Sequence, residues 1–256
     1  MKHLPRFTIS DDNTPSETDS IVRLSGGELH HLRDVMKLGV GTEVVLSGAN
    51  GREYAGQIVA FDRHAAIITV SSARFSANAN SSRLILAAGI IKAARMDMLI
   101  EKAAELDAAE IWPLICHRSV VREPGSERQQ RWRRIAEAAS KQSLRGRPME
   151  IHAPLPVETM VSRLPRATCA IVCAAGAPPL VAMIRRLANI KACPIVILAV
   201  GPEGDFTAEE MATMGKAGFV AAGLGANRLR SETAALAALS IVGGVLAELD
   251  ELNYTA

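Results

Sequence analysis

The stretch PIVILAVGPEGD, residues 194–205, decides the fold class of this chain. Its apolar run ends directly in a loop of glycine, proline and acidic residues. Continuous apolar runs are typical of strands buried on both faces of a parallel sheet. Four similar runs alternate with helical stretches: LILAAGII (84–91), IWPLI (111–115), CAIVCAA (169–175) and FVAAGL (219–224). This alternation predicts an α/β domain with a mostly parallel sheet.

The clearest helix lies near the C-terminus, over residues 232–249. Its apolar residues recur at steps of four and three and form one stripe: Ala235, Leu239, Val242, Leu246 and Leu249. Such a stripe packs either on the protein's own core or on a partner subunit.

The N-terminal part has a different pattern. The stretch VVLSGANGREYAGQIVAF (44–61) contains two apolar runs around a polar turn, which predicts a β-hairpin. The stretch SGGELHHLRDVMKL (25–38) has helical spacing and predicts one short helix. We therefore expect a small β-barrel with a helix at residues 1–72, a linker at 73–83 and the α/β domain at 84–256.

Composition excludes several classes of protein. Hydrophobic residues make up 48% of the 256 residues, so wholesale disorder is excluded. The first residues, MKHLPRFTIS, lack the apolar stretch of a signal peptide, and no uninterrupted apolar run is long enough to span a bilayer. The four cysteines form no CxxC pair. We expect a cytoplasmic protein without a metal site or a membrane partner.

Charge is unevenly distributed along the chain. The net charge is only +2, but residues 118–147 contain nine Arg or Lys and three Glu. Such a segment is either a binding surface for a polyanion such as nucleic acid or a well-solvated helix face.

Familiar nucleotide and hydrolase motifs are missing. The sequence has no GxxxxGK[ST] loop, no GxGxxG turn after a first strand and no GxSxG elbow. Two other loops, Gly201–Asp205 and Gly225–Arg230, follow apolar runs directly. In open α/β sheets, ligands bind where the carboxyl ends of strands meet loops. These loops either build a pocket or are ordinary connections.

The two loops also have a family resemblance. GPEGDFTAEE (201–210) and LGANRLRSETAAL (224–236) resemble the two signature stretches of the RsmE family. Three further stretches resemble that family in the expected order: 30–44, 92–120 and 131–151. The resemblance implies an S-adenosylmethionine-dependent methyltransferase that acts on N3 of a uridine in 16S ribosomal RNA of the small subunit.

The resemblance also implies an architecture. It predicts an N-terminal PUA-like β-barrel that binds RNA and a C-terminal SPOUT domain, in which the last helix threads a trefoil knot. Members of the family work as homodimers with the site at the subunit interface.

Residue roles follow from the same resemblance. Arg230 and Glu232 are the candidate catalytic residues: a base takes the N3 proton, or a guanidinium stabilises negative charge on the flanking carbonyl oxygens. Glu203 either holds its own loop or a ribose hydroxyl, or is simply an exposed carboxylate. The candidate cofactor-binding residues are Leu198, Gly201, Pro202, Glu203, Gly204, Leu224, Gly225, Leu229, Thr233 and Ala234. The candidate RNA-binding residues are Arg6, Arg118, Arg145 and Arg147.

Three positions depart from the family pattern. Asp205 replaces a glycine and adds a charge beside the donor site, Lys141 replaces an acid, and Asn227-Arg228 replaces an arginine followed by an apolar residue.

Two other functional interpretations keep the fold. One is an RNA methylase with another target, and the other is a non-enzymatic RNA-binding or ribosome-assembly protein.

Overall fold

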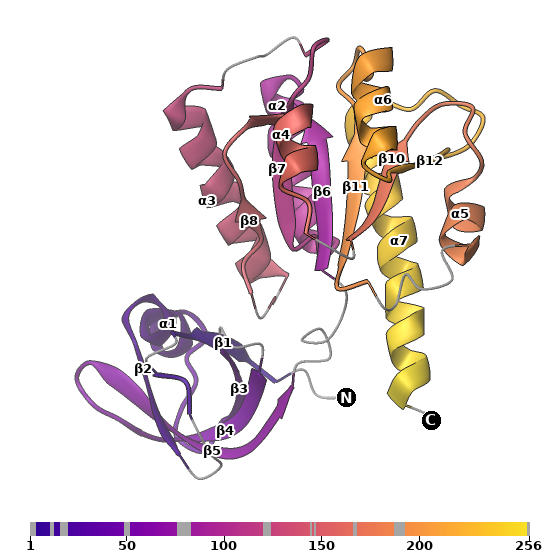
Figure 1. Cartoon of the computed structure of the whole chain (residues 1–256). Helices are drawn as coiled ribbons and strands as arrows, with labels where there is room; N and C mark the ends of the chain where they lie inside the picture. The colour runs from indigo at the N-terminus through magenta and orange to yellow at the C-terminus, as the bar shows by residue number, and fades with distance from the viewer. Residues whose placement is uncertain are drawn as a thin grey trace. The chain divides into compact units, whose positions relative to one another are not determined.

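The computed structural model describes residues 4–10, 13–15, 20–48, 52–75, 83–119, 124–143, 145, 147–165, 168–186 and 193–254. The chain divides into an N-terminal unit, residues 1–80, and a C-terminal unit, residues 81–256, which Figure 1 shows in indigo to magenta and in magenta to yellow.

The C-terminal unit is built on a parallel sheet (Figure 1). Its strand order is β12-β10-β11-β6-β7-β8, and β9 also pairs with β7. The strands are β6 (Arg83–Gly89), β7 (Glu110–Ile115), β8 (Glu150–Ile151), β9 (Leu155–Pro156), β10 (Thr168–Cys173), β11 (Ile195–Val200) and β12 (Val220–Ala222). Every pairing is parallel, which confirms the prediction from the apolar runs.

Helices cover both faces of this sheet. They are α2 (Ala93–Glu105), α3 (Ser126–Gln142), α4 (Val157–Ser162), α5 (Leu180–Arg186), α6 (Ala208–Lys216) and α7 (Ser231–Tyr254). Leu84 and Leu86 of β6 face a core formed with α2, α3, α5 and α7. Ile85 and Ala87 face a second core formed with α4 and α6. Side chains alternate between the faces of a strand, so a strand buried on both faces must be apolar throughout.

The last helix packs its predicted stripe on the sheet. Ala235, Leu239, Val242 and Leu246 are buried in the core that includes β6 and β11, whereas the side chain of Leu249 lies outside the described residues. One described stretch, Ser231–Glu248, is long and apolar enough to cross a membrane. Packing against the sheet accounts for much of this apolar character. The threading of α7 through a knot stays a prediction of the resemblance.

The N-terminal unit is a curled five-stranded sheet with strand order β1-β3-β4-β5-β2. Its elements are β1 (Arg6–Ile9), β2 (Ile21–Ser25), α1 (Gly26–His30), a π-helical turn η2 (His31–Val35), β3 (Glu43–Gly48), β4 (Arg52–Phe61) and β5 (Ala65–Phe75). Strands β3 and β4 form the predicted hairpin, whose turn lies outside the described residues. No pairing between β1 and β2 is found within the described part, so the sheet is a half-barrel there.

The segment that we predicted to be a linker is partly strand. Strand β5 continues to Phe75, because Arg52–Tyr54 of β4 pair with residues 73–75. The linker prediction was therefore wrong for residues 73–75.

Trp132 is the largest fully buried side chain, and its indole Nε1 has no hydrogen-bond partner among the described residues. We expect Trp132→Ala to lower the free energy of unfolding by about 3–5 kcal/mol, because it leaves a cavity between α3 and the sheet. Trp132→Phe should cost about 2 kcal/mol or less, because it also removes the unpaired N–H. Urea denaturation of both variants tests this, and equal losses would contradict it.

Candidate functional site

The polar loops of the C-terminal unit meet at one edge of the sheet. Parallel strands end at the same edge, here called the carboxyl edge, and four segments follow the ends of β6, β7, β11 and β12 there: 89–92, 116–119, 201–206 and 223–230. The fold therefore places the two glycine loops, 201–206 and 223–230, at the same edge of the sheet, as expected for a ligand site in an α/β sheet.

Close backbone packing fixes the first glycine loop, residues 201–206, against β6. A methyl group added at Gly89 would lie 2.5 Å from the backbone nitrogen of Pro202 and 2.6 Å from its Cδ. Real Cβ atoms do not approach backbone so closely, so only glycine allows this contact.

Asp205 occupies a turn with left-handed backbone. Its φ is 64°, a conformation that glycine adopts freely and that Asp tolerates better than most residues. Its Oδ1 accepts a hydrogen bond from the backbone N–H of Phe206 at 2.8 Å, and its own N–H donates to the carbonyl of Pro202 at 2.9 Å. The departure from the family pattern is therefore accommodated by the local geometry.

A capping box joins the next helix to the neighbouring loop. Glu210 Oε2 accepts from the Thr207 N–H at 2.7 Å, and Thr207 Oγ1 accepts from the Glu210 N–H at 3.2 Å. The other oxygen of Glu210 accepts from the His117 N–H at 2.8 Å. Arg118 donates to the carbonyl of Gly204 at 3.2 Å. Together these bonds tie the loop after β7 to the loop after β11.

Cys116 lies in this region but is not a reactive thiol. Burial raises its pKa to about 12, the negative charge of Glu210 adds to the rise, and a hydrogen bond with Ser119 opposes it. The protonated thiol is a poor nucleophile, so Cys116 is not a candidate for covalent catalysis.

The second glycine loop, residues 223–230, is anchored at its start and open at its end. A methyl group at Gly223 would lie 2.5 Å from the carbonyl oxygen of Ala177, and Gly223 exchanges backbone hydrogen bonds with Pro178 and Leu180. Gly225 has a φ of 119°, which disfavours other residues. The side chains of Leu229 and Arg230 are exposed, so they are free to contact a ligand.

Three charged side chains from three elements lie beside one another at this edge. Arg95 on α2 places Nη1 3.7 Å from Glu203 Oε1 and Nε 3.6 Å from Glu232 Oε1. Sequence reasoning named both glutamates but missed Arg95. It lies more than 100 residues before both partners in the sequence, and no local pattern links them.

The other predicted cofactor-binding residues also lie at or near the carboxyl edge, but they differ in how exposed their side chains are. Leu198 is fully buried in β11, so only its backbone is available to a ligand. Pro202 is buried against β6, and Leu224 is partly buried in the core. Gly204 is exposed beside Arg118, and Thr233 and Ala234 lie in the first turn of α7.

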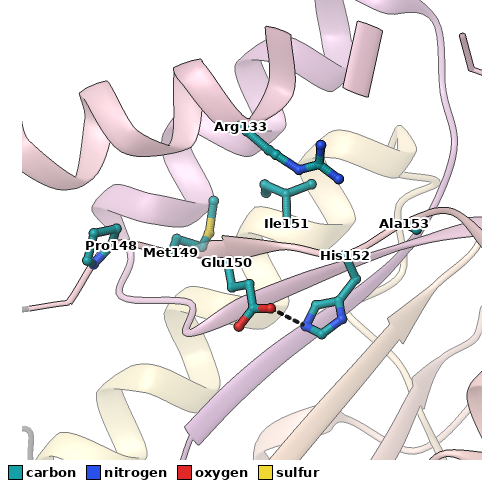
Figure 2. Close-up of a pocket in the computed structure, with 7 residues that line it drawn as sticks. All are labelled: Arg133, Pro148, Met149, Glu150, Ile151, His152 and Ala153. Carbon is teal, nitrogen blue, oxygen red and sulfur yellow. Dashed lines mark ion pairs between the residues drawn. The ribbon is translucent and has the colours of Figure 1, made fainter. Parts of the chain in front are cut away.

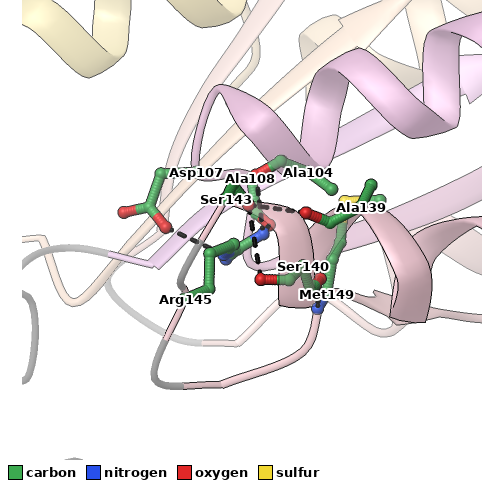
Figure 3. A network of polar contacts seen from close by, with 8 residues as sticks. All are labelled: Ala104, Asp107, Ala108, Ala139, Ser140, Ser143, Arg145 and Met149. Atoms are coloured by element: carbon green, nitrogen blue, oxygen red, sulfur yellow. Dashed lines mark hydrogen bonds and ion pairs between the residues drawn. The ribbon is translucent and has the colours of Figure 1, made fainter. Parts of the chain in front are cut away.

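The predicted RNA-binding arginines lie in both units and make different contacts. Arg6 pairs with buried Glu53 in the N-terminal unit. Arg145 donates to the carbonyls of Ala104 and Ala108 at 3.2 and 2.7 Å, so it caps the end of α2 (Figure 3). Its Nε also lies 3.0 Å from Asp107. Burial lowers the pKa of Arg145, and the charge of Asp107 opposes this change.

The basic segment 118–147 spans the sheet from edge to edge. Arg118 lies at the carboxyl edge, whereas Arg145 lies at the opposite edge, where α2 ends before β7 begins. Within one chain these charges do not form a single patch. Arg147 is exposed, and Lys141, one of the three departures, pairs with Glu137 on the surface of α3.

Comparison with known proteins gives the same assignment as the motifs. The family model of the RNA methyltransferase domain matches residues 78–243. The ribosomal RNA small subunit methyltransferase E of Bacillus subtilis is 24% identical over 245 residues, which cover 93% of this chain and 96% of that protein. The corresponding protein of Synechocystis is 28% identical and covers 89% of this chain and 74% of its own length.

Solved structures agree. Ribosomal RNA small subunit methyltransferase E from Neisseria gonorrhoeae, bound to S-adenosyl methionine, is 25% identical with a TM-score of 0.73 and covers 95% of this chain and 98% of its own. The chain belongs to the RsmE family of RNA methyltransferases. Since the match spans both units, it confirms the predicted class, a SPOUT domain with a smaller barrel-like N-terminal domain.

A separate pocket of about 610 Å³ lies away from the RsmE signature loops (Figure 2). It is lined by Arg133, Pro148, Met149, Glu150, Ile151, His152 and Ala153. His152 Nε2 lies 2.7 Å from Glu110 and 3.6 Å from Glu150. Both carboxylates lie at the starts of β7 and β8, so the pocket is at the edge opposite the glycine loops. No cluster of metal-ligating side chains is found within the described ranges.

The contact between β6 and the first glycine loop can be tested with paired glycine variants. We expect Gly89→Ala to lower the free energy of unfolding by about 1–3 kcal/mol, because the added methyl group displaces the Pro202 backbone. Gly215→Ala is the control, because Gly215 lies in α6 with open space around it, and it should stabilise by about 0.5–1 kcal/mol. Similar effects of both substitutions on chemical denaturation would refute the proposed packing constraint.

Proposed function

We propose that this protein transfers the methyl group of S-adenosylmethionine to N3 of a uridine in 16S ribosomal RNA of the small subunit. The observation that supports this most is the full-length similarity to small subunit methyltransferase E, together with glycine loops packed at the carboxyl edge. The similarity includes the N-terminal unit, so it is not limited to the methyltransferase domain.

The residues at the carboxyl edge suit a methyl donor that carries ribose hydroxyls and an ammonium group. Glu203 and Glu232 have buried carboxylate oxygens without hydrogen-bond partners among the described residues. Such oxygens favour ligands with O–H and N–H donors. The glycine loops supply backbone groups, and Leu224 and Leu229 supply apolar contact. When bound, S-adenosylmethionine provides a methyl group activated by its sulfonium sulfur.

Alignment is the main task of the protein in this reaction. A displacement at a methyl carbon needs the attacking nitrogen in line with the leaving sulfur, and no covalent enzyme intermediate is required. Uridine N3 lies on the Watson–Crick edge, so the target base must be unpaired or flipped out. The exposed Arg230 and the buried Glu232, two residues apart at the start of α7, are placed to contact that base.

Arg230 and Glu232 offer two ways to manage the N3 proton. The Arg230 guanidinium has no partner among the described residues, so it can stabilise negative charge on the uracil carbonyl oxygens. Glu232 Oε2 is free to accept the N3 hydrogen. Arg230 is the exposed residue directly before α7, whereas Glu232 is buried in its first turn, so the two groups are alternative candidates for this task.

The proposal includes partners and location. The ribosomal RNA would meet the exposed arginines of the carboxyl edge, Arg118 and Arg230, while the partly buried apolar residues of α7 would face a second subunit in a homodimer. We expect the protein in the cytoplasm, where small subunits are assembled.

A methylation assay with labelled S-adenosylmethionine and unmodified small ribosomal subunits tests the function. We expect label in the RNA, and nucleoside mass spectrometry should identify it as 3-methyluridine. Label in another nucleoside would refute the assigned position and leave an RNA methylase with another target. Absence of donor binding would refute the enzymatic function and favour an RNA-binding or assembly protein.

Substitution of Arg230 tests its catalytic role. We expect Arg230→Ala to lower kcat by about 10²–10³-fold with little change in donor affinity, because the guanidinium acts on the target base. Arg228→Ala is the matched control, since Arg228 is exposed in the same loop. A larger loss with Arg228→Ala would contradict the assignment of Arg230 as the catalytic arginine.

A further inference from the structure

The cluster of Arg95, Glu203 and Glu232 joins three segments that are far apart in the sequence. Arg95 lies in the first turn of α2, Glu203 in the first glycine loop and Glu232 in the first turn of α7. One guanidinium lies within 4 Å of both carboxylates and approaches them through different nitrogens, Nη1 and Nε.

Glu232 is a buried acid with little compensation. Only 6% of its side chain is exposed, and Oε2 makes no hydrogen bond to the described residues. Burial of an unpaired carboxylate is costly, so a nearby cation is needed to keep it in place. Arg95 is the cation that forms an ion pair with it in the described part of the chain.

Glu203 has the same feature on the other side of the guanidinium. Both of its oxygens are buried and without hydrogen-bond partners in the described part. At 3.6–3.7 Å, the contacts with Arg95 are longer than hydrogen bonds. Arg95 therefore interacts with the two carboxylates electrostatically, while these three buried oxygens accept no hydrogen bond from the described residues.

We propose that Arg95 is a positioning residue of the methyl-transfer site, which holds Glu203 toward the methyl donor and Glu232 toward the target base. This inference rests on the proposed function. Glu203 lies in the first glycine loop, and both of its oxygens lack a hydrogen-bond donor among the described residues, so the O–H and N–H groups of the cofactor would supply one. Glu232 is two residues after Arg230 in the sequence, and its Oε2 lacks a donor among the described residues, so the N–H of the base would supply one.

The chemistry of the side chain supports arginine at this position. A planar guanidinium presents N–H groups in several fixed directions, so it can serve two carboxylates at once. A lysine ammonium is a point charge on a flexible stem and would favour one carboxylate over the other. Loss of the positive charge of Arg95 would leave Glu203 and Glu232 without the cation that pairs with both.

Double-mutant cycles on Arg95 with each glutamate test this role. The readouts are the Kd for S-adenosylmethionine from calorimetry and kcat from single-turnover methylation of small subunits. We expect Arg95→Ala to weaken donor binding by about 5–10-fold and to lower kcat by about 10–100-fold. In a Glu203→Gln background, Arg95→Ala should change the donor Kd less than about twofold. In a Glu232→Gln background, it should change kcat less than about threefold.

Conservative and control variants separate positioning from folding. Arg95→Lys should keep the melting temperature of the wild type and recover only part of one parameter, because one ammonium cannot hold both acids. Arg95→Gln serves if the alanine variant does not fold. Lys102→Ala is the matched control, because Lys102 also lies on α2 and contacts two glutamates, Glu101 and Glu105, at 2.7 and 2.8 Å. It should leave both parameters unchanged.

Additive effects in both cycles, or full activity of Arg95→Ala, would overturn the inference. The donor cycle needs no RNA, so it is independent of the target. If the wild type binds the donor but does not methylate subunits, the proposed function fails while coupling of Arg95 to Glu203 still supports the positioning role. If the wild type binds no donor, both proposals fail.

Discussion

The packing of Pro202 on Gly89 is the contact on which the site depends. It brings the loop after β11 against the end of β6, a central strand of the parallel sheet. The two backbones are so close that position 89 cannot carry a side chain. The loop is thereby held at the carboxyl edge near the first turn of α2. Arg95 in that turn forms an ion pair with Glu203 of the loop. A bulkier residue at position 89 would move the loop and, with it, every contact that the loop makes to α2 and to the segment after β7.

Two further sets of bonds extend this rigid edge. Glu210 closes the capping box of α6 and accepts from the backbone of His117, so one buried carboxylate orders a helix start and a neighbouring loop. Arg118 adds a bond to the carbonyl of Gly204. The backbone of the first glycine loop is thus held by contacts with β6 and with the segment after β7, whereas Leu229 and Arg230 at the end of the second loop remain exposed. A tightly held first loop and an exposed second loop are consistent with the proposed binding of a small cofactor by one and of RNA by the other.

Much of the C-terminal fold was predictable, because strands buried on both faces must be apolar throughout, as β6 and β11 are. The glycine loops were also found, since they directly follow such strands. Arg95 was not found, because its partners are distant in the sequence and only the topology brings them together. The role of Arg145 was missed for a similar reason: a count of charges cannot show that a guanidinium caps the end of α2. The strand at residues 73–75 was missed because its pairing with β4, not its composition, determines its structure.

Amide hydrogen exchange with and without S-adenosylmethionine tests the location of the site most directly. The account predicts that the donor slows exchange in residues 201–206 and 223–230, where the glycine loops meet at the carboxyl edge. Unchanged exchange in both loops on a protein that binds the donor, or protection confined to residues 148–153 around the pocket at the opposite edge, would contradict it.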